Sequence, residues 1–231
     1  MKRFYKNVSV GDQNGAHTIL LDGAPIKTPA RALLTLPTKA LAEAVADEWR
    51  EQGETLDPAA MPLTKIANTA IDLVPHKRGV VCGEVLRFGA ADLLCYRADN
   101  APDLAARQAA HWDPLLAWVA QTHAAALVPT TGITFVEQPA EARMALEKAV
   151  WARDDFALAA LQTAASLCGS LVLALALADA KLSAEEAFAE ARLDEEYQAE
   201  KWGRDAEAEA RARAQRAELA AAECVFRALT K

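Results

Sequence analysis

Hydrophobic and polar residues follow a strand pattern in the first third of the chain and a helical pattern after it. Short strand-like runs occur at residues 4–10, 18–21, 25–27 and 32–36, and Asp22-Gly23 between two of them is typical of a tight hairpin turn. From Thr38, a candidate N-cap, Leu41, Val45 and Trp49 recur on one face of a helix that ends at Gly53. This spacing predicts that Trp49 is structural and that its helix docks the β-rich unit against the helical unit.

After Pro58 the sequence reads as helical to its end. A capping box at Ser183-Ala-Glu-Glu186 marks one helix start unambiguously. Periodicity, caps and prolines predict helices at about 61–74, 78–96, 103–127 (interrupted or re-started at 113–114), 141–151, 154–178, 183–202 and 204–229. The expected fold class is α+β, with a small β-rich N-terminal domain over residues 1–57 and a larger all-α domain over residues 58–231.

Composition and charge narrow the possible functions. Hydrophobic residues make up 52% of the 231 positions, which is ample for a core, and the formal net charge is -7. An acidic balance argues against binding to nucleic acid or to anionic membranes, because both rest on basic surfaces. The uncharged stretch between Asp155 and Asp179 is long enough to span a bilayer, yet it is rich in alanine and contains Gln162 and Ser166. We interpret it as buried helix and expect no membrane insertion.

Candidate chemistry is sparse. The four cysteines are scattered without a C-x-x-C pair, and the four histidines are equally dispersed, which favours reduced, buried thiols over a disulfide framework or a metal site. Neither a phosphate-binding loop nor a G-x-S-x-G nucleophile motif occurs. Asp72 and Asp92 lie on apolar helices, where buried acids usually bind helix ends or pair with arginine. We expect no catalytic residues, no cofactor and no metal.

An acidic segment, residues 190–203, is the strongest candidate for a functional site. Consecutive helical residues point about 100° apart, so Asp194, Glu195 and Glu196 fan out and cannot converge on one metal or bond. Asp194 shares a face with Gln198, and Glu195 shares one with Gln198 and Trp202. A carboxylate, an amide and an indole on one side of a helix form a surface suited to gripping another protein. The alternative is a solvated helix whose aromatic residues turn inward.

Several sequence blocks carry a family resemblance when taken together and in order. They are Arg3-Phe-Tyr-Lys6, Leu21-Asp-Gly23 with Lys27-Thr-Pro29, Leu36-Pro-Thr38, Asp47-Glu-Trp49 with Gln52, Met61-Pro-Leu-Thr64, Thr69-Ala-Ile-Asp72, Asp92-Leu-Leu-Cys-Tyr-Arg97, Gln108 with Trp112-Asp-Pro-Leu-Leu-Ala-Trp118, Ser170-Leu-Val-Leu-Ala-Leu-Ala-Leu177, and the acidic block through Gln198 to Trp202-Gly203. The chain thus resembles the assembly chaperones of the F-type ATP synthase catalytic head that serve its alpha subunit. These blocks cover nearly the whole chain. Asp194 stands where the family motif has glutamate.

The resemblance implies a non-enzymatic chaperone that holds the unassembled alpha subunit and covers the surface that later meets a beta subunit. It implies a cytoplasmic bacterial member, because mitochondrial members carry a presequence and this chain starts at the domain itself. We expect a monomer whose partner contacts are Asp194 first and Glu195 second, with Gln198 and Trp202 beside them and Glu196 as a bystander. The alternatives are an enzyme with a site in the cleft between the two domains and a peripheral membrane protein.

Overall fold

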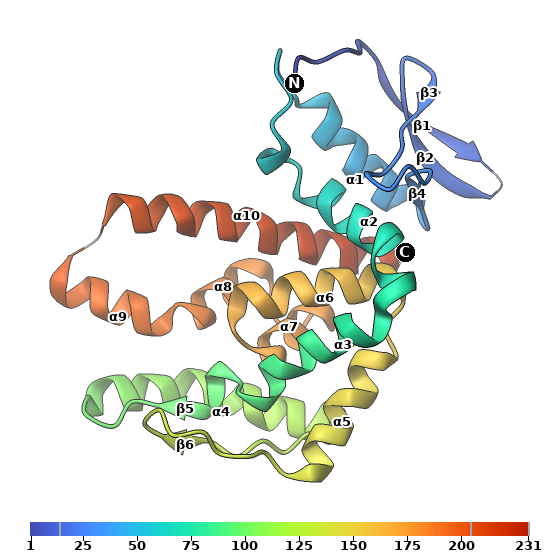
Figure 1. The fold of residues 1–231 in the computed structure, drawn as a ribbon. Helices are drawn as coiled ribbons and strands as arrows, with labels where there is room; N and C mark the ends of the chain where they lie inside the picture. The colour runs from blue at the N-terminus through green and yellow to red at the C-terminus, as the bar shows by residue number, and fades with distance from the viewer. Residues whose placement is uncertain (14, 204, 231) are drawn as a thin grey trace.

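The computed structural model describes every residue except 14, 204 and 231, and it confirms the α+β class (Figure 1). A four-stranded antiparallel sheet near the N-terminus consists of β1 (Val8–Gln13), β2 (Ala16–Leu21), β3 (Ala24–Pro25) and β4 (Thr35–Leu36), with β2 paired to each of the others. Asp22 and Gly23 both have positive φ, 50° and 85°, as the predicted two-residue turn requires.

The predicted first strand at residues 4–10 is shifted, because β1 starts only at Val8. The residues before it cross to the segment that follows the first helix: Lys2 pairs with Thr55, and the Arg3 amide donates to the Glu54 carbonyl at 2.8 Å. The first residues of the chain are thus hydrogen-bonded to residues 54–55, so the two ends of the strand unit lie side by side.

Helix α1 (Lys39–Arg50) packs on the sheet, and its start is as predicted, since the Thr38 hydroxyl accepts the Leu41 amide at 3.2 Å. Trp49 is half-buried against the core, and its ring lies 5.8 Å from that of Tyr5. The Tyr5 hydroxyl donates to the Trp49 carbonyl at 2.7 Å. This tryptophan therefore joins α1 to the N-terminal segment, which agrees with a structural role.

The buried carboxylate of Glu48 links the strand unit to the helical body. It accepts the backbone amides of Leu63 and Thr64 at 2.6 and 2.8 Å, and the Thr64 hydroxyl at 2.8 Å. These amides belong to the first turn of α2 (Pro62–Asp72), which has no side-chain cap of its own. Burial raises the pKa of Glu48 above its ordinary value despite these three donors. The last turn of α1 thus caps α2.

The helical body surrounds a central pair of apolar helices, α6 (Asp155–Cys168) and α7 (Leu171–Ala178) (Figure 1). All seven residues from Leu171 to Leu177 are buried. Around this pair lie α2, α3 (Val74–Ala90), α4 (Pro102–His123), α5 (Ala140–Trp151), α8 (Ala184–Ala191), α9 (Leu193–Trp202) and α10 (Ala206–Leu229), with short 3₁₀ turns at Pro58–Ala60 and Leu93–Cys95.

Two helices predicted as continuous are each broken in two. The stretch 154–178 breaks at Gly169, whose φ of 63° ends α6, and Ser170 then caps α7. The buried Asp92 carboxylate accepts the Ser170 hydroxyl at 2.6 Å and the Val172 amide at 3.0 Å, so it binds a helix end as expected. Within the described residues, no helix is long and apolar enough to cross a membrane. The stretch 183–202 breaks at Arg192.

Three further differences concern the middle of the chain. The helix expected at residues 78–96 ends early, at Ala90, whereas its start is as predicted, because α3 is kinked at Lys77, whose φ of -135° and ψ of 29° are not helical. Helix α4 runs through Pro114 without interruption. Between α4 and α5, β6 (Thr130–Thr131) pairs in parallel with β5 (Tyr96–Arg97) inside the region expected to be helical.

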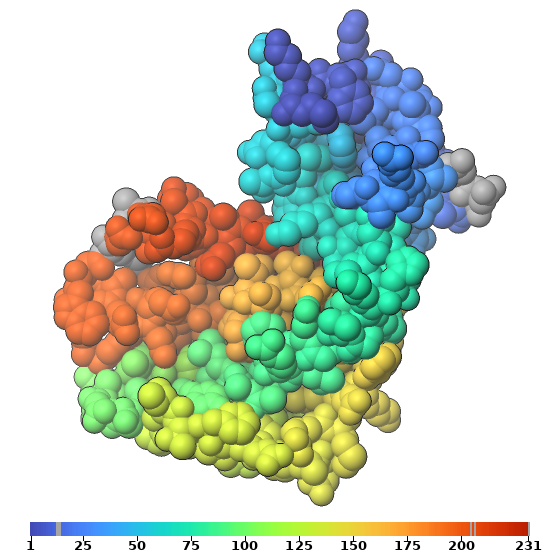
Figure 2. Space-filling view, viewed as in Figure 1, coloured from blue at the N-terminus to red at the C-terminus, as the bar shows by residue number. Residues whose placement is uncertain are grey.

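The strand unit projects from the helical body, and a notch separates it from the N-terminal half of α10 (Figure 2). The Lys65 ammonium meets the Glu218 carboxylate at 2.9 Å, and the Thr38 hydroxyl donates to the Ala228 carbonyl at 2.9 Å. Both contacts tie α10 to the first part of the chain. The division into domains 1–57 and 58–231 stays a prediction.

Candidate partner-binding surface

The helix predicted at residues 183–202 forms two short helices, α8 and α9, and the acidic segment 190–203 lies almost wholly in α9. Helix α8 begins with the predicted capping box, in which the Ser183 amide donates to the Glu186 carboxylate at 2.7 Å. Helix α9 then starts after Arg192, and its buried residues are Leu193 and Tyr197. These two lie one turn apart and define the inward face of α9.

The inward face of α9 packs against α4 through polar contacts. The Arg107 guanidinium grips the Glu200 carboxylate with two hydrogen bonds of 2.8 and 2.9 Å and lies 5.3 Å from the centre of the Tyr197 ring. Within α9 itself, the Lys201 ammonium lies 4.2 Å from the centre of the Tyr197 ring and donates to its hydroxyl, which holds that ring in place. Arg107 of α4 thus holds the C-terminal half of α9 through Glu200 and Tyr197.

Asp194 belongs to this internal contact. Its carboxylate accepts a hydrogen bond of 2.8 Å from the side-chain amide of Gln108, which is only 1% exposed. The carbonyl oxygen of that amide accepts the Ala98 backbone N–H at 2.8 Å, so Gln108 connects Asp194 to the loop after β5. The residue expected to be the leading partner contact is therefore half-buried and already engaged within the chain.

The other three candidate residues come together on the opposite side of α9. Glu195, Gln198 and Trp202 are exposed and line one groove between α9 and α10, of about 560 Å³. We call it the α9–α10 groove; its further lining residues are Phe188, Arg192, Glu196, Ala199, Gly203, Asp205, Ala208, Glu209, Ala212, Arg213 and Arg216. Glu196, expected to be a bystander, thus lies on the same groove.

Helical phase explains this division of residues. Counting 100° per residue from Leu193, Glu195 lies at about 200°, Gln198 at about 140° and Trp202 at about 180°. Asp194 lies at only about 100°, close to the buried side. The buried pair Leu193 and Tyr197 was the available signal for the outward face, and it points to Glu195 and Trp202 rather than Asp194.

Trp202, the last residue of α9, is 77% exposed. Large aromatic side chains bury 150–250 Å² when covered and are enriched at protein interfaces. Neither Glu195, Gln198 nor Trp202 has a hydrogen bond or ion pair with a described residue. The carboxylate, the amide and the indole can therefore form hydrogen bonds and apolar contacts with a partner.

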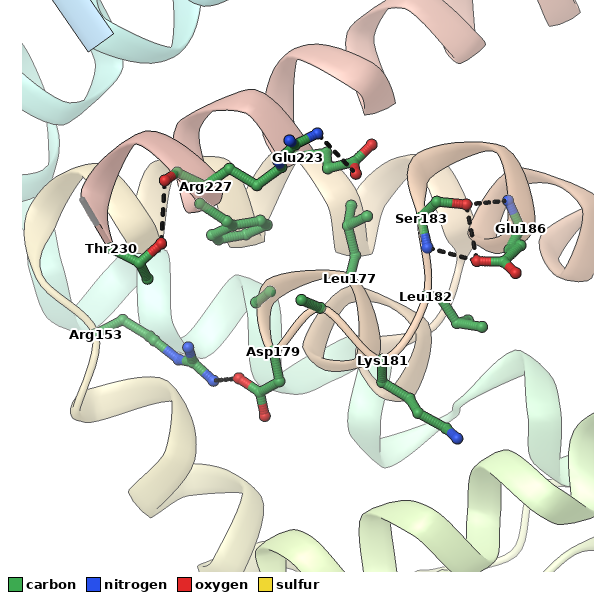
Figure 3. Close-up of a pocket in the computed structure, with 13 residues that line it drawn as sticks. Arg153, Leu177, Asp179, Lys181, Leu182, Ser183, Glu186, Glu223, Arg227 and Thr230 are labelled. Atoms are coloured by element: carbon green, nitrogen blue, oxygen red, sulfur yellow. Dashed lines mark hydrogen bonds and ion pairs between the residues drawn. The ribbon is translucent and has the colours of Figure 1, made fainter. Parts of the chain in front are cut away.

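A second groove, of about 610 Å³, lies between the C-terminal end of α10 and the connection from α7 to α8 (Figure 3). Its acids are already engaged: Asp179 pairs with Arg153 at 2.7 Å, Glu186 completes the α8 capping box, and Glu223 accepts the Ala184 amide at 3.0 Å. These acids stabilise helix ends and the α5–α6 connection, so their contacts have a structural explanation and do not indicate a binding site.

The space between the strand unit and the helical body offers poor chemistry for an enzyme. A pocket of about 250 Å³ there is lined by Ala40 of α1 and by α10 residues that include Glu223, Cys224 and Arg227. Burial raises the pKa of the Cys224 thiol, which disfavours the thiolate that a nucleophile needs. The four cysteines are all free, and burial raises the pKa of Cys95 and of Cys168 to about 12. Among the described residues, no cluster of metal-ligating side chains forms.

Comparison with known proteins gives the fold a family. Residues 2–120 match the profile of the ATP12 chaperone protein family. The mitochondrial protein atp12 of Schizosaccharomyces pombe is 26% identical over 214 residues, which cover 87% of this chain and 74% of the yeast protein.

Two solved structures share this fold over nearly the full length of the chain. The crystal structure of Atp12 from Paracoccus denitrificans has a TM-score of 0.91 and 41% identity, covering 100% of this chain and 98% of that one. A candidate chaperone from Agrobacterium tumefaciens has a TM-score of 0.95 and 44% identity, covering 99% of this chain and 86% of that one. The chain therefore belongs to the ATP12 chaperone family, which implies an assembly chaperone for ATP synthase rather than an enzyme.

Proposed function

We propose that this protein binds the unassembled alpha subunit of the F-type ATP synthase and shields the surface that later meets a beta subunit. It acts as a monomer, with the bacterial cytoplasm as the location expected from the sequence. The observation that carries the proposal is the exposed surface of α9, where Glu195, Gln198 and Trp202 line an open groove on the fold of an assembly chaperone.

The chemistry of this surface suits a temporary partner. An exposed indole supplies apolar contact area, whereas a neighbouring carboxylate and amide supply orientation and specificity. Because α9 is fixed to α4 by Arg107 and Gln108, the surface is held in place before the partner arrives. Binding therefore has a small ordering cost on the chaperone side.

Size-exclusion chromatography with light scattering tests the proposal on isolated subunits. The protein should form a one-to-one complex with free alpha subunit and none with beta subunit or with the assembled catalytic head. Added beta subunit should release it by mass action, because both would occupy one surface. A stable complex of the chaperone with the assembled head would refute the shared surface, and absence of binding to free alpha subunit would refute the proposed client.

A further inference from the structure

The N-terminal half of α10 contacts the rest of the protein mainly through partly buried and polar residues. None of residues 207–218 is buried, and Leu219 is the first residue of α10 that enters the core. Ala208, Ala212 and Gln215 are half-buried and recur at helical spacing on the side that faces α9. More than three turns of helix therefore form one wall of the α9–α10 groove with little packing of their own.

Acids and bases line both walls of this groove, but the charges that remain unengaged have opposite signs on the two walls. Asp205 caps α10, Arg192 lies over the Phe188 ring, and Glu196 and Glu209 have interactions of their own. On the α9 wall, Glu195 has no ion pair or hydrogen bond with a described residue. On the α10 wall, Arg213 is exposed and likewise has no described partner, and the one ion pair of Arg216 with a described residue is to the exposed Glu185 at 3.3 Å. Between the walls, Ala199, Ala208 and Ala212 form a floor of small side chains.

Both ends of the groove are aromatic. Trp202 lies at the end of α9, and Phe188 lies at the other end, where the Arg192 and Arg216 guanidinium groups approach its ring at 5.6 and 4.9 Å. The apolar floor and the exposed indole favour an occupant with an apolar edge. Glu195 and Arg213 on the two walls favour a cation on one flank of that occupant and an anion on the other.

The walls also restrict the backbone of the occupant. Both are α-helices whose peptide groups are satisfied within the helix, so the groove offers no free strand edge for an extended peptide to extend. Recognition must then proceed through side chains alone, as when an amphipathic helix lies in a groove with its apolar residues at i, i+3, i+4 and i+7.

We propose that the α9–α10 groove binds one amphipathic α-helix of the client subunit, with an apolar edge on the alanine floor, a cation facing Glu195 and a carboxylate facing Arg213. This inference rests on the proposed function and adds the kind of segment that is held. A helix fits this groove because it satisfies its own peptide groups, and residues on its two flanks can still reach opposite walls at once.

Filling the groove with a matched pair of substitutions tests the inference. Ala212→Trp adds an indole at the floor, whereas Ala214→Trp adds the same group on an exposed position of α10 that does not line the groove. Isothermal titration with free alpha subunit should show binding weakened about tenfold or more by Ala212→Trp and unchanged by Ala214→Trp. Ala208→Trp, a second groove position, should repeat the effect, and circular dichroism checks that each variant is folded.

A photo-crosslinking amino acid at position 212 then identifies the bound segment by mass spectrometry. A crosslinked segment that is helical and amphipathic in the alpha subunit supports the inference, and a strand or loop overturns it. Equal binding by wild type and Ala212→Trp, or equal losses in Ala212→Trp and Ala214→Trp, would also overturn it while the proposed client stands. If wild-type protein does not bind alpha subunit at all, the proposed function itself fails.

Discussion

The side-chain amide of Gln108 donates to the Asp194 carboxylate at 2.8 Å and so binds α9 to α4 from inside the protein. Gln108 is buried and uses its other end to accept the Ala98 amide, so the three groups form a short chain from the loop after β5 to the acidic helix. Asp194, which the sequence suggests as a partner contact, is thus also positioned to orient α9.

Asp194→Lys should therefore lose stability as well as alpha-subunit binding. Without the carboxylate, the buried Gln108 amide lacks an acceptor, which costs about 1–3 kcal/mol and lowers the melting temperature of a chain of this size by about 2–4 °C per kcal/mol. Asp194→Asn keeps an acceptor oxygen and should melt and bind like wild type. Thermal melts and titrations check both. A folded Asp194→Lys with unchanged melting but lost binding would mean that Asp194 contacts the partner directly.

Glu195→Lys should behave in the opposite way. Glu195 is exposed and has no described partner within the chain, so the change in unfolding free energy should stay within about 0.5 kcal/mol. A cation beside the expected partner cation costs several kcal/mol in binding. Glu51→Lys, an equal charge change at an exposed residue of the strand unit, serves as the control and should bind normally. Equal losses in both variants would indicate a diffuse effect of net charge.

Local signals in the sequence predicted the parts of the fold that depend on neighbours in the chain. The Asp22-Gly23 turn, the Thr38 cap and the Ser183 capping box each involve residues within four positions of one another, and all three are confirmed. Glu48 could not be foreseen as the cap of α2, because its acceptors serve amides 15 and 16 positions away that only the tertiary fold brings near.

The sequence also showed no sign that the helix predicted at residues 183–202 breaks at Arg192. No glycine or proline marks Arg192, where α8 ends and α9 begins; the guanidinium of Arg192 instead lies over Phe188 at 5.6 Å. Helical phase gave the angles between Asp194, Glu195 and Trp202 correctly, but not which of them faces inward. That orientation is set by Leu193 and Tyr197, whose burial against the body is a tertiary fact.

Two glycines of α3 provide a test of packing between helices. A Cβ added at Gly89 would lie 2.9 Å from methyl groups of both Leu146 and Leu171, so Gly89→Ala should cost about 1–3 kcal/mol through overpacking. Gly83 lies in the same helix with no atom within 4 Å of an added Cβ, and Gly83→Ala should stabilise by about 0.4–1 kcal/mol. Urea denaturation measures both. Stabilisation by Gly89→Ala would show that α3 can move away from α5 and α7.

The pH dependence of stability should reveal the buried Asp92. Burial raises its pKa to about 6 from 3.8, although the Ser170 hydroxyl and two backbone amides donate to it. The folded state thus holds this proton more tightly than the unfolded state. The contribution of Asp92 to stability is therefore greatest below its unfolded pKa and falls as the pH rises from about 4 to about 6, by an amount on the order of 3 kcal/mol.

A carbon-13 NMR titration of the Asp92 carboxyl group checks this directly. Its midpoint should lie near pH 6, well above that of exposed aspartates. Unfolding measured between pH 4 and pH 6 should also show a smaller decline for Asp92→Asn than for wild type, because the variant has no proton to release there. A midpoint near 4 would mean that the three donors outweigh burial.

Two tryptophans with different surroundings should separate stability from binding. Trp49 is half-buried beside Tyr5, so Trp49→Ala should cost about 3 kcal/mol, the low end for a large-to-small change at a buried aromatic. Trp202 is 77% exposed, so Trp202→Ala should leave stability nearly unchanged yet weaken alpha-subunit binding by about 2 kcal/mol or more. Urea unfolding and titration of each variant provide the comparison. If Trp49→Ala unfolds like wild type but fails to bind, Trp49 belongs to the interface; if Trp202→Ala binds normally, the end of α9 does not contact the client.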